Sequence, residues 1–267
     1  ATLLGCGSSG GVPRVGFGWG ICDPHEARNR RRRCALLLER DGAEGGRTTV
    51  LIDTGADMRQ QLLDAEVKAV DGVLYTHDHA DHTHGIDDLR VLALYQRSLV
   101  DVHADRRTAA LLRSRFDYCF ETPPGSSYPP ILTLNTIAVG QPVSIGGAGG
   151  PITALPFEQD HGDIQSLGFR IGDFAYSSDI NGLPKESEDL LQGLDVWIVD
   201  ALRPTLHPSH WSLPETLAWI DKLKPRRAIL TNMHTDMDYQ TLRRSLPDGV
   251  EPGYDGMRIE LSAAGTN

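Results

Sequence analysis

The part of this sequence richest in chemistry is a run of three histidines and two aspartates within six residues. It reads His77-Asp78-His79-Ala80-Asp81-His82 and directly follows the apolar run Val73-Leu74-Tyr75. So many imidazoles and carboxylates cannot all pack in a core, because their donors and acceptors would lack partners. At the end of a strand they can instead converge on a cation, and this donor set suits Zn, Mn or Fe. We therefore expect a metal site here, with a solvated polar loop as the alternative.

Three further ligand-type residues each come directly after an apolar run. His161 follows Ile152–Asp160, Asp179 follows Phe174–Ser178, and His234 comes three residues after Ala228–Thr231. Taken singly, each could be an ordinary surface residue. Their shared position at the carboxyl ends of expected strands, where the sites of α/β proteins assemble, predicts that they join the motif.

With these residues the chain resembles the metallo-β-lactamase superfamily, whose hallmark is His-x-His-x-Asp-His followed by three separated ligands. The resemblance covers essentially the whole chain. It implies a single domain over residues 1–267 with an α/β, four-layered αβ/βα sandwich fold and two divalent cations, Zn²⁺ or Mn²⁺, at one edge of the sheets. The implied ligands of one ion are His77, His79 and His161, those of the other are Asp81, His82 and His234, and Asp179 bridges them. Asp81 is implied to be catalytic as well, and Asp53 to orient the ligands.

Within the superfamily, two segments look like the carbon–phosphorus lyase accessory cyclic phosphodiesterase group, relatives of the tRNA 3′-processing endonucleases. They are Gly5-Cys6-Gly7-Ser8-Ser9-Gly10-Gly11-Val12-Pro13 and Tyr254-Asp255-Gly256-Met257. That group carries a histidine in the loop before a late helix, and His210 fits this place. The resemblance implies that His210 serves the phosphate as a hydrogen-bond donor or general acid. Asp200, at the end of Val196–Val199, is expected to support the site or to cap the next turn.

The chain departs from that group at two places. The separate zinc site of the group uses clustered cysteines, whereas only Cys22 is present here, so we expect two metal ions and no third. Where the relatives read Leu-Thr-His, this chain reads Leu230-Thr231-Asn232-Met233-His234. Asn is a poor ligand for a hydrolytic Zn or Mn centre, so we expect His234 to be the last ligand and keep Asn232 as the alternative.

These observations predict a dinuclear metal-dependent phosphodiesterase that hydrolyses a small cyclic or nucleotide-like phosphodiester. A metal-bridging hydroxide would attack phosphorus, and His210 would donate a proton. Two alternatives stay open. The same centre could hydrolyse a thioester, lactone or other carbonyl substrate, or the chain could be a nucleotide-binding module without turnover.

Two weaker patterns could contact the substrate phosphate. Backbone N–H groups around Ser8 and Ser9 in the Gly-rich opening could cradle a phosphate, although such a loop is also a common tight turn. Arg30 and Arg31 begin the only dense basic run, Arg30–Arg33. That run is either a phosphate anchor or a solvated loop.

The elements that must position these residues are short apolar runs alternating with amphipathic segments. Strands are expected at Leu3–Cys6, Cys34–Glu39, Thr49–Asp53, Gly72–Thr76, Val100–His103, Ile131–Val139, Ile152–Phe157, Leu167–Ile171, Phe174–Ser178, Val196–Asp200, Ala228–Thr231 and Met257–Leu261. Helices are expected at Ala56–Glu66, Asp87–Arg97, Arg106–Phe116, Lys185–Gln192, Leu213–Leu223 and Tyr239–Leu246. The early strands follow one another closely and the later ones alternate with helices, which favours packed sheets with helices outside. Glu121–Pro151, rich in Pro and Gly, is expected to be a loop around a short strand.

Composition limits the partners. The formal net charge of −10 argues against large nucleic acids as ligands, since their binders are normally basic. Four unevenly spaced cysteines give no disulfide framework, and no signal peptide or membrane segment is recognised, so we expect a cytoplasmic protein. The expected partner is a small phosphodiester or nucleotide-like substrate, with a homodimer left open and no membrane.

Overall fold

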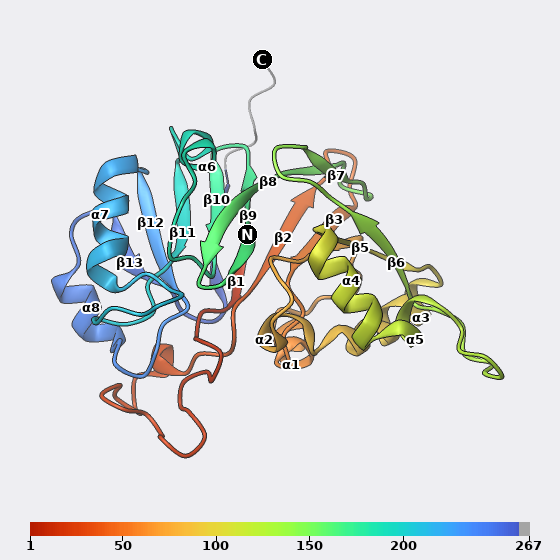
Figure 1. Ribbon diagram of the computed structural model, residues 1–267, viewed down its shortest axis with the longest axis horizontal. Coiled ribbons are helices and arrows are strands. Elements are labelled where there is room, and N and C mark those ends of the chain that lie inside the picture. The colour runs from red at the N-terminus through yellow and green to blue at the C-terminus, as the bar shows by residue number, and fades with distance from the viewer. Residues whose placement is uncertain (262–267) are drawn as a thin grey trace.

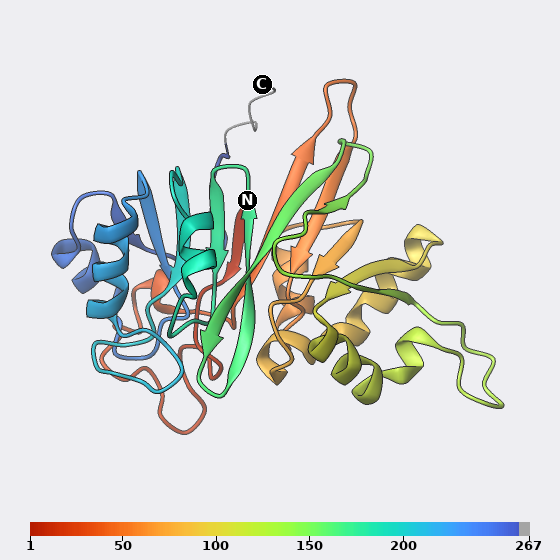
Figure 2. The same ribbon diagram turned by 45° about the horizontal axis from the view of Figure 1, so that its top comes forward.

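Two seven-stranded sheets form the protein, and helices cover their outer faces (Figure 1). The computed structural model describes residues 1–261. In Figures 1 and 2 the first sheet carries α1, α3 and α4 on its outer side, and the second carries α7 and α8. This is the α/β sandwich that the sequence predicts. Within the described residues, no helix combines the length and apolar character needed to cross a membrane.

The first sheet has the order β14-β1-β2-β3-β4-β5-β6, with β3 to β6 running parallel. Its strands are β14 (Met257–Arg258), β1 (Thr2–Gly5), β2 (Ala35–Asp41), β3 (Arg47–Ile52), β4 (Gly72–Leu74), β5 (Val100–Ala104) and β6 (Leu132–Thr136). Its helices are α1 (Met58–Asp64), α2 (Ala80–Thr83), α3 (Leu89–Gln96), α4 (Arg106–Arg115) and α5 (Asp117–Phe120).

The second sheet has the order β13-β12-β11-β10-β9-β8-β7, with β10 to β13 running parallel. Its strands are β13 (Val250–Pro252), β12 (Arg227–Thr231), β11 (Val196–Asp200), β10 (Phe174–Ser177), β9 (Ile164–Ile171), β8 (Ile152–His161) and β7 (Val143–Ile145). Its helices are α6 (Lys185–Leu190), α7 (Leu213–Leu223) and α8 (Tyr239–Ser245).

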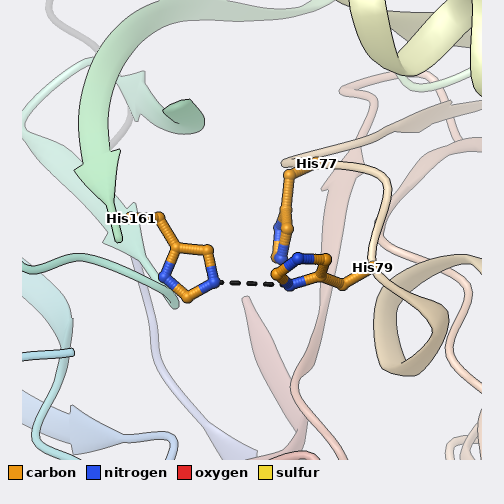
Figure 3. A group of neighbouring side chains, drawn as sticks. All are labelled: His77, His79 and His161. Atoms are coloured by element: carbon orange, nitrogen blue, oxygen red, sulfur yellow. Dashed lines mark hydrogen bonds between the residues drawn. The ribbon is translucent and has the colours of Figure 1, made fainter. Parts of the chain in front are cut away.

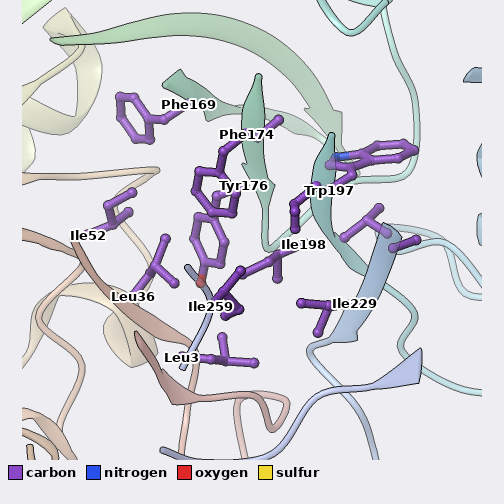
Figure 4. Packing of buried hydrophobic residues seen from close by; sticks show 14 of the residues in the cluster. Leu3, Leu36, Ile52, Phe169, Phe174, Tyr176, Trp197, Ile198, Ile229 and Ile259 are labelled. Atoms are coloured by element: carbon purple, nitrogen blue, oxygen red, sulfur yellow. The ribbon is translucent and has the colours of Figure 1, made fainter. Parts of the chain in front are cut away.

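The main core lies between the two sheets. Side chains alternate along a strand, so Leu36 of β2 faces the second sheet while Leu37 faces the helices of the first. Figure 4 shows Leu36 and Ile52 from the first sheet pointing into the same space as Phe169 and Tyr176 from the second. Burial of apolar surface therefore fixes one sheet against the other.

The carboxyl ends of five strands meet along one edge and carry the candidate residues. The motif follows β4, His161 ends β8, and Asp179 comes two residues after β10. Asp200 ends β11, and Asn232 follows β12. The loop after β11 is held by α7, whose first turn is closed by a capping box between Ser212 and Glu215.

The elements differ from expectation mainly where polar residues interrupt a strand. We expected β8 to end at Phe157, but it continues through Glu158 and Asp160 to His161 because it pairs with β9 along its whole final part. Pairing in the hairpin satisfies the hydrogen bonds of the backbone N–H and C=O groups, whichever side chains face solvent. Five short elements were not expected: α2, α5, β7, β13 and the 3-10 helix Ala27–Asn29. The segment expected to hold one short strand, Glu121–Pro151, holds two, β6 and β7.

Candidate metal centre

Three imidazoles from two sheets meet at the edge between them. His77 and His79 lie in the loop after β4, and His161 faces them from the end of β8 (Figure 3). One ligand atom of each lies within 4.8 Å of the others, and His161 Nε2 is 3.4 Å from His79 Nδ1. His77 is buried, and its Nε2 has no hydrogen-bond partner among the described residues. A buried nitrogen without a partner beside two further imidazoles is what a bound cation would satisfy.

A second group adjoins the first through Asp179. His82 Nε2 lies 3.1 Å from Asp179 Oδ2 and 3.4 Å from Asp81 Oδ2. The other oxygen of Asp179, Oδ1, lies 3.9 Å from His161 Nε2. One carboxylate therefore presents an oxygen to each group, which is the arrangement a bridging ligand requires.

The protonation of His77 and His161 also suits a cation. Burial lowers the pKa of His77 well below its usual value, and burial also lowers the pKa of His161. Both imidazoles are therefore neutral at physiological pH, with a lone pair free for a metal ion. The donor set of imidazoles and carboxylates fits divalent metal binding.

Two of the candidate ligand rings are held from their far side. Asp53 Oδ2 accepts a hydrogen bond from His82 Nδ1 at 2.7 Å, and both Asp53 oxygens accept from Thr76. His161 Nδ1 donates to the carbonyl of Ser209 at 2.7 Å. Such bonds fix the tautomer, so Nε2 of each ring is left for the cluster. Thr76 and Ser209 were not predicted; only the position of Thr76 next to the motif could have suggested it.

His210 borders the ligand cluster and is joined to Asp200. Its Nδ1 donates to Asp200 Oδ2 at 2.7 Å, and its ring lies 4.7 Å from that of His161. Burial disfavours the imidazolium, but the Asp200 carboxylate outweighs burial and raises the pKa of His210 to about 9. The Asp200 carboxylate thus favours the protonated imidazole, whose Nδ1 lies 3.9 Å from Asp179 Oδ1.

The structure places Asn232, not His234, against the cluster. Asn232 Nδ2 donates to Ser178 O at 2.7 Å and lies 3.2 Å from Asp179 Oδ1. His234 belongs to none of the three-ligand groups among the described residues, and its Nε2 faces the guanidinium of Arg14. A nitrogen that accepts from a guanidinium faces a cationic donor, so this conformation does not offer it to a metal ion. Asn232 has a left-handed backbone (φ 59°), which Asn tolerates better than most residues and which turns the loop here.

The four residues expected to contact phosphate differ in their surroundings. Ser8 is buried, and its Oγ has no partner among residues 1–261, while Ser9 is exposed. Arg30 is exposed and stacks on Trp19. Arg31 is only 2% exposed and donates to Met237 O at 2.7 Å, so it supports the loop before α8 instead of facing solvent.

A cavity of about 530 Å³ opens beside His79. Its other lining residues are Asp78, Ala80, His84, Arg115 and Phe116. Arg115 donates to the carbonyl of Asp78 and, at 3.1 Å, to its carboxylate, which anchors the motif loop to α4. Sequence reasoning gave no role to Arg115, because it lies 37 residues from its partner.

Comparison with known proteins agrees with this geometry. Residues 48–233 match the family model described as the beta-lactamase superfamily domain. A crystal structure described as a new diphosphatase from the PhnP family is 31% identical, with a TM-score of 0.85 over 96% of this chain and 94% of that one. Human tRNase Z, short form, is 18% identical with a TM-score of 0.62 over 98% and 99% of the two chains, a likeness of fold.

One curated relative carries a different activity in its name. The octanoyltransferase of Porphyromonas gingivalis is 31% identical over 98% of this chain but 52% of its own length. The chain thus spans about half of that relative.

Proposed function

This chain belongs to the metallo-β-lactamase superfamily and is a metal-dependent hydrolase, and we propose that it cleaves a small phosphodiester or diphosphate bond. The observation that carries the proposal is the position of His210, whose Nδ1 donates to the buried Asp200 carboxylate and whose ring borders the ligand cluster. A cationic proton donor next to a cation site suits a reaction in which an anionic phosphorus centre loses an alkoxide. One relative is described as a diphosphatase, an enzyme that acts at phosphorus, and this supports the same reaction class.

We assign two cation positions to the cluster. His77, His79 and His161 would hold one ion, Asp81 and His82 the other, and Asp179 both. When bound, such cations lower the pKa of water towards about 7 and neutralise charge on phosphate oxygens. Both Zn²⁺ and Mn²⁺ accept this donor set.

The chain's own residues supply the remaining steps. The His79 side of the cluster opens to the 530 Å³ cavity, so the substrate enters there. His210 then donates a hydrogen bond or its proton to an oxygen of the phosphate. Asp200 is fully buried and fixes the imidazole so that Nε2 is the donating atom.

Acyl transfer or hydrolysis at a carbonyl is the second candidate, favoured by the name of the octanoyltransferase relative. The cysteines of this chain argue against a covalent acyl route. All four are buried, and burial raises the pKa of each, so none offers a reactive thiolate. A carbonyl substrate would have to be attacked at the metal centre.

Hydrolysis rates on three substrates separate these functions. Protein loaded with Zn²⁺ or Mn²⁺ should hydrolyse bis(p-nitrophenyl) phosphate with a larger kcat/KM, relative to the uncatalysed rate, than p-nitrophenyl octanoate or an octanoyl thioester. His77→Ala is the matched control for contaminating esterase or phosphodiesterase. Faster relative turnover of the octanoyl esters would overturn the proposal and favour the carbonyl reaction.

A further inference from the structure

His210 lies on a long irregular loop, since the described residues between Asp200 and Leu213 form neither a helix nor a strand. Residues 204–206 and 208 of this loop are exposed, so packing against the core does not hold it in place. The bond to Asp200 fixes the imidazole of His210, but it does not fix the backbone that carries the imidazole. Other contacts must therefore set how close the loop lies to the ligand cluster.

The side chain of Asn181 bridges this loop to the turn that follows His161. Its Nδ2 donates to Pro208 O at 2.8 Å, and its Oδ1 accepts from the N–H of Gly162 at 3.0 Å. A carbonyl oxygen can only accept and a backbone N–H can only donate, so the two partners fix the orientation of the amide. One side chain thus connects the segment of a candidate ligand to the segment of the proton donor.

The backbone around Asn181 makes it a firm support. Its own N–H donates to Asp160 O at 2.8 Å, and Gly182 O accepts from the N–H of Asp160 at 3.0 Å, which attaches this segment to β8. The preceding residue, Ile180, is fully buried, and its carbonyl accepts from the N–H of Trp211 at 2.7 Å. The segment is therefore fixed both to β8 and to the far end of the loop.

Two consecutive carbonyls of the loop are held in this way. Asn181 donates to Pro208 O, and His161 Nδ1 donates to the next carbonyl, Ser209 O, at 2.7 Å. The turn and the loop approach so closely that a Cβ at Gly162 would lie 2.8 Å from Cβ of Ser209, so a glycine is needed there. The two peptide groups before the proton donor are thus tied to the end of β8.

We propose that Asn181 is a positioning residue for the proposed reaction, which holds the loop where the imidazole of His210 reaches the substrate phosphate. Asparagine suits this role because a single short amide supplies both a donor and an acceptor. The inference rests on the proposed function and deepens it, because it assigns the placement of the proton donor to a residue that acts through the loop. A misplacement of about 1 Å at a reacting group can cost about a hundredfold in rate.

Two matched substitutions test the proposal. Asn181→Ala should lower kcat on a phosphodiester about tenfold to hundredfold and change KM less than about threefold, because placement affects the transition state and not ground-state binding. Gln96→Ala is the control. The Gln96 amide also accepts from one backbone N–H and donates to one carbonyl, both of Val70, at 2.9 and 3.1 Å. This control should lose similar stability in urea unfolding but keep the wild-type kcat.

A double variant shows whether Asn181 acts through His210. Once His210→Ala has removed the imidazole, the placement of the loop no longer affects proton donation. Adding Asn181→Ala to that variant should then lower kcat by less than about threefold further. Two losses that multiply, or an Asn181→Ala variant with the wild-type kcat, would overturn the proposal.

A measurement without turnover separates this inference from the reaction. In Zn²⁺-loaded protein, the proton that joins His210 Nδ1 to the buried Asp200 carboxylate should give a low-field proton NMR resonance that is absent from His210→Ala. Asn181→Ala should broaden or abolish this resonance, because a loosened loop lets water exchange the proton, whereas Gln96→Ala should keep it. The spectra decide even if no phosphodiester is hydrolysed and the phosphodiesterase proposal fails. A wild type without the resonance, or an equally sharp one in Asn181→Ala, contradicts the role of Asn181.

Discussion

His210 Nδ1 donates to Oδ2 of Asp200, and the carboxylate is fully buried while the imidazole borders the candidate metal ligands. The pair therefore joins a proton donor at the site to a charge that solvent cannot screen. Positioned proton transfer typically contributes 10²–10⁴-fold, so His210→Ala should lower kcat on a phosphodiester by roughly that factor. Metal content, measured by mass spectrometry of the eluted ions, should stay near the wild-type value. A variant that loses its metal, or one with full activity, would show that His210 has another role.

The leaving group tells which oxygen His210 serves. If it protonates the leaving oxygen, His210→Ala should harm substrates with alkyl leaving groups more than those with p-nitrophenolate, which needs little protonation. Equal losses for both would mean that it stabilises the phosphoryl oxygens instead. Asp200→Asn keeps the shape of the pair but removes the charge that raises the pKa of His210. In this variant too, the loss of activity should be smaller for substrates with a p-nitrophenolate leaving group than for those with an alkyl leaving group.

Asp179→Ala should lower both metal content and activity. Its two oxygens face different groups of imidazoles, so its loss would remove a ligand from both of the proposed cation positions. Metal affinity should fall by more than the roughly 10–100-fold expected when a residue that only orients ligands is removed. Equilibrium dialysis against Zn²⁺ or Mn²⁺ measures this, with Asp53→Ala as the comparison. An Asp179→Ala variant that binds two ions as tightly as wild type would remove it from the centre.

Substitutions at positions 232 and 234 decide which residue completes the proposed second metal site. The sequence predicts His234 as the ligand, whereas in the structure Asn232 contacts Asp179 and His234 faces Arg14. We expect His234→Ala to retain its full metal content and Asn232→Ala to bind the second ion more weakly in a metal titration. The opposite result would restore the prediction from the sequence and would require Arg14 to move away from His234.

Asp238 makes the stability of the protein depend on acid pH. It caps α8, and burial alone would raise its pKa, but hydrogen bonds from Asn29, Thr241 and Asp23 outweigh burial and lower that pKa to about 2. The folded pKa lies below the unfolded one, so this stabilisation is present above pH ~4 and is lost as pH falls towards 2. Asp238→Ala should therefore cost about 1–2 kcal/mol in urea unfolding at pH 7, with the difference shrinking between pH 4 and 2. Asp238→Asn keeps a capping side chain but cannot titrate. If the loss of unfolding free energy in Asp238→Ala is the same at every pH, the Asp238 carboxylate is not the source of the pH-dependent stability.

The parts of the site that could be predicted from the sequence are those fixed by local pattern. The motif lies within six residues after an apolar run, and His161 and Asp179 each end or follow a strand, so their meeting follows from sheet topology. No local sequence pattern determines whether Asn232 or His234 contacts Asp179. A single left-handed residue in a loop sets which of the two side chains turns towards Asp179, and no periodicity encodes it. The contact of Arg14 with His234 joins opposite ends of the chain and depends on the whole fold.

The candidate ligands come from both sheets: the motif from the first, His161 and Asp179 from the second. A cation bound there would join two layers that otherwise are held together at this edge by side-chain packing and a few loop contacts. Since an ion that binds only the folded form stabilises it by RT ln(1 + [M]/Kd), each tenfold rise in free metal above Kd adds about 1.4 kcal/mol to the free energy of unfolding. Metal supply would thus govern the stability of the folded protein as well as its turnover, and chelation would first loosen this edge between the two sheets.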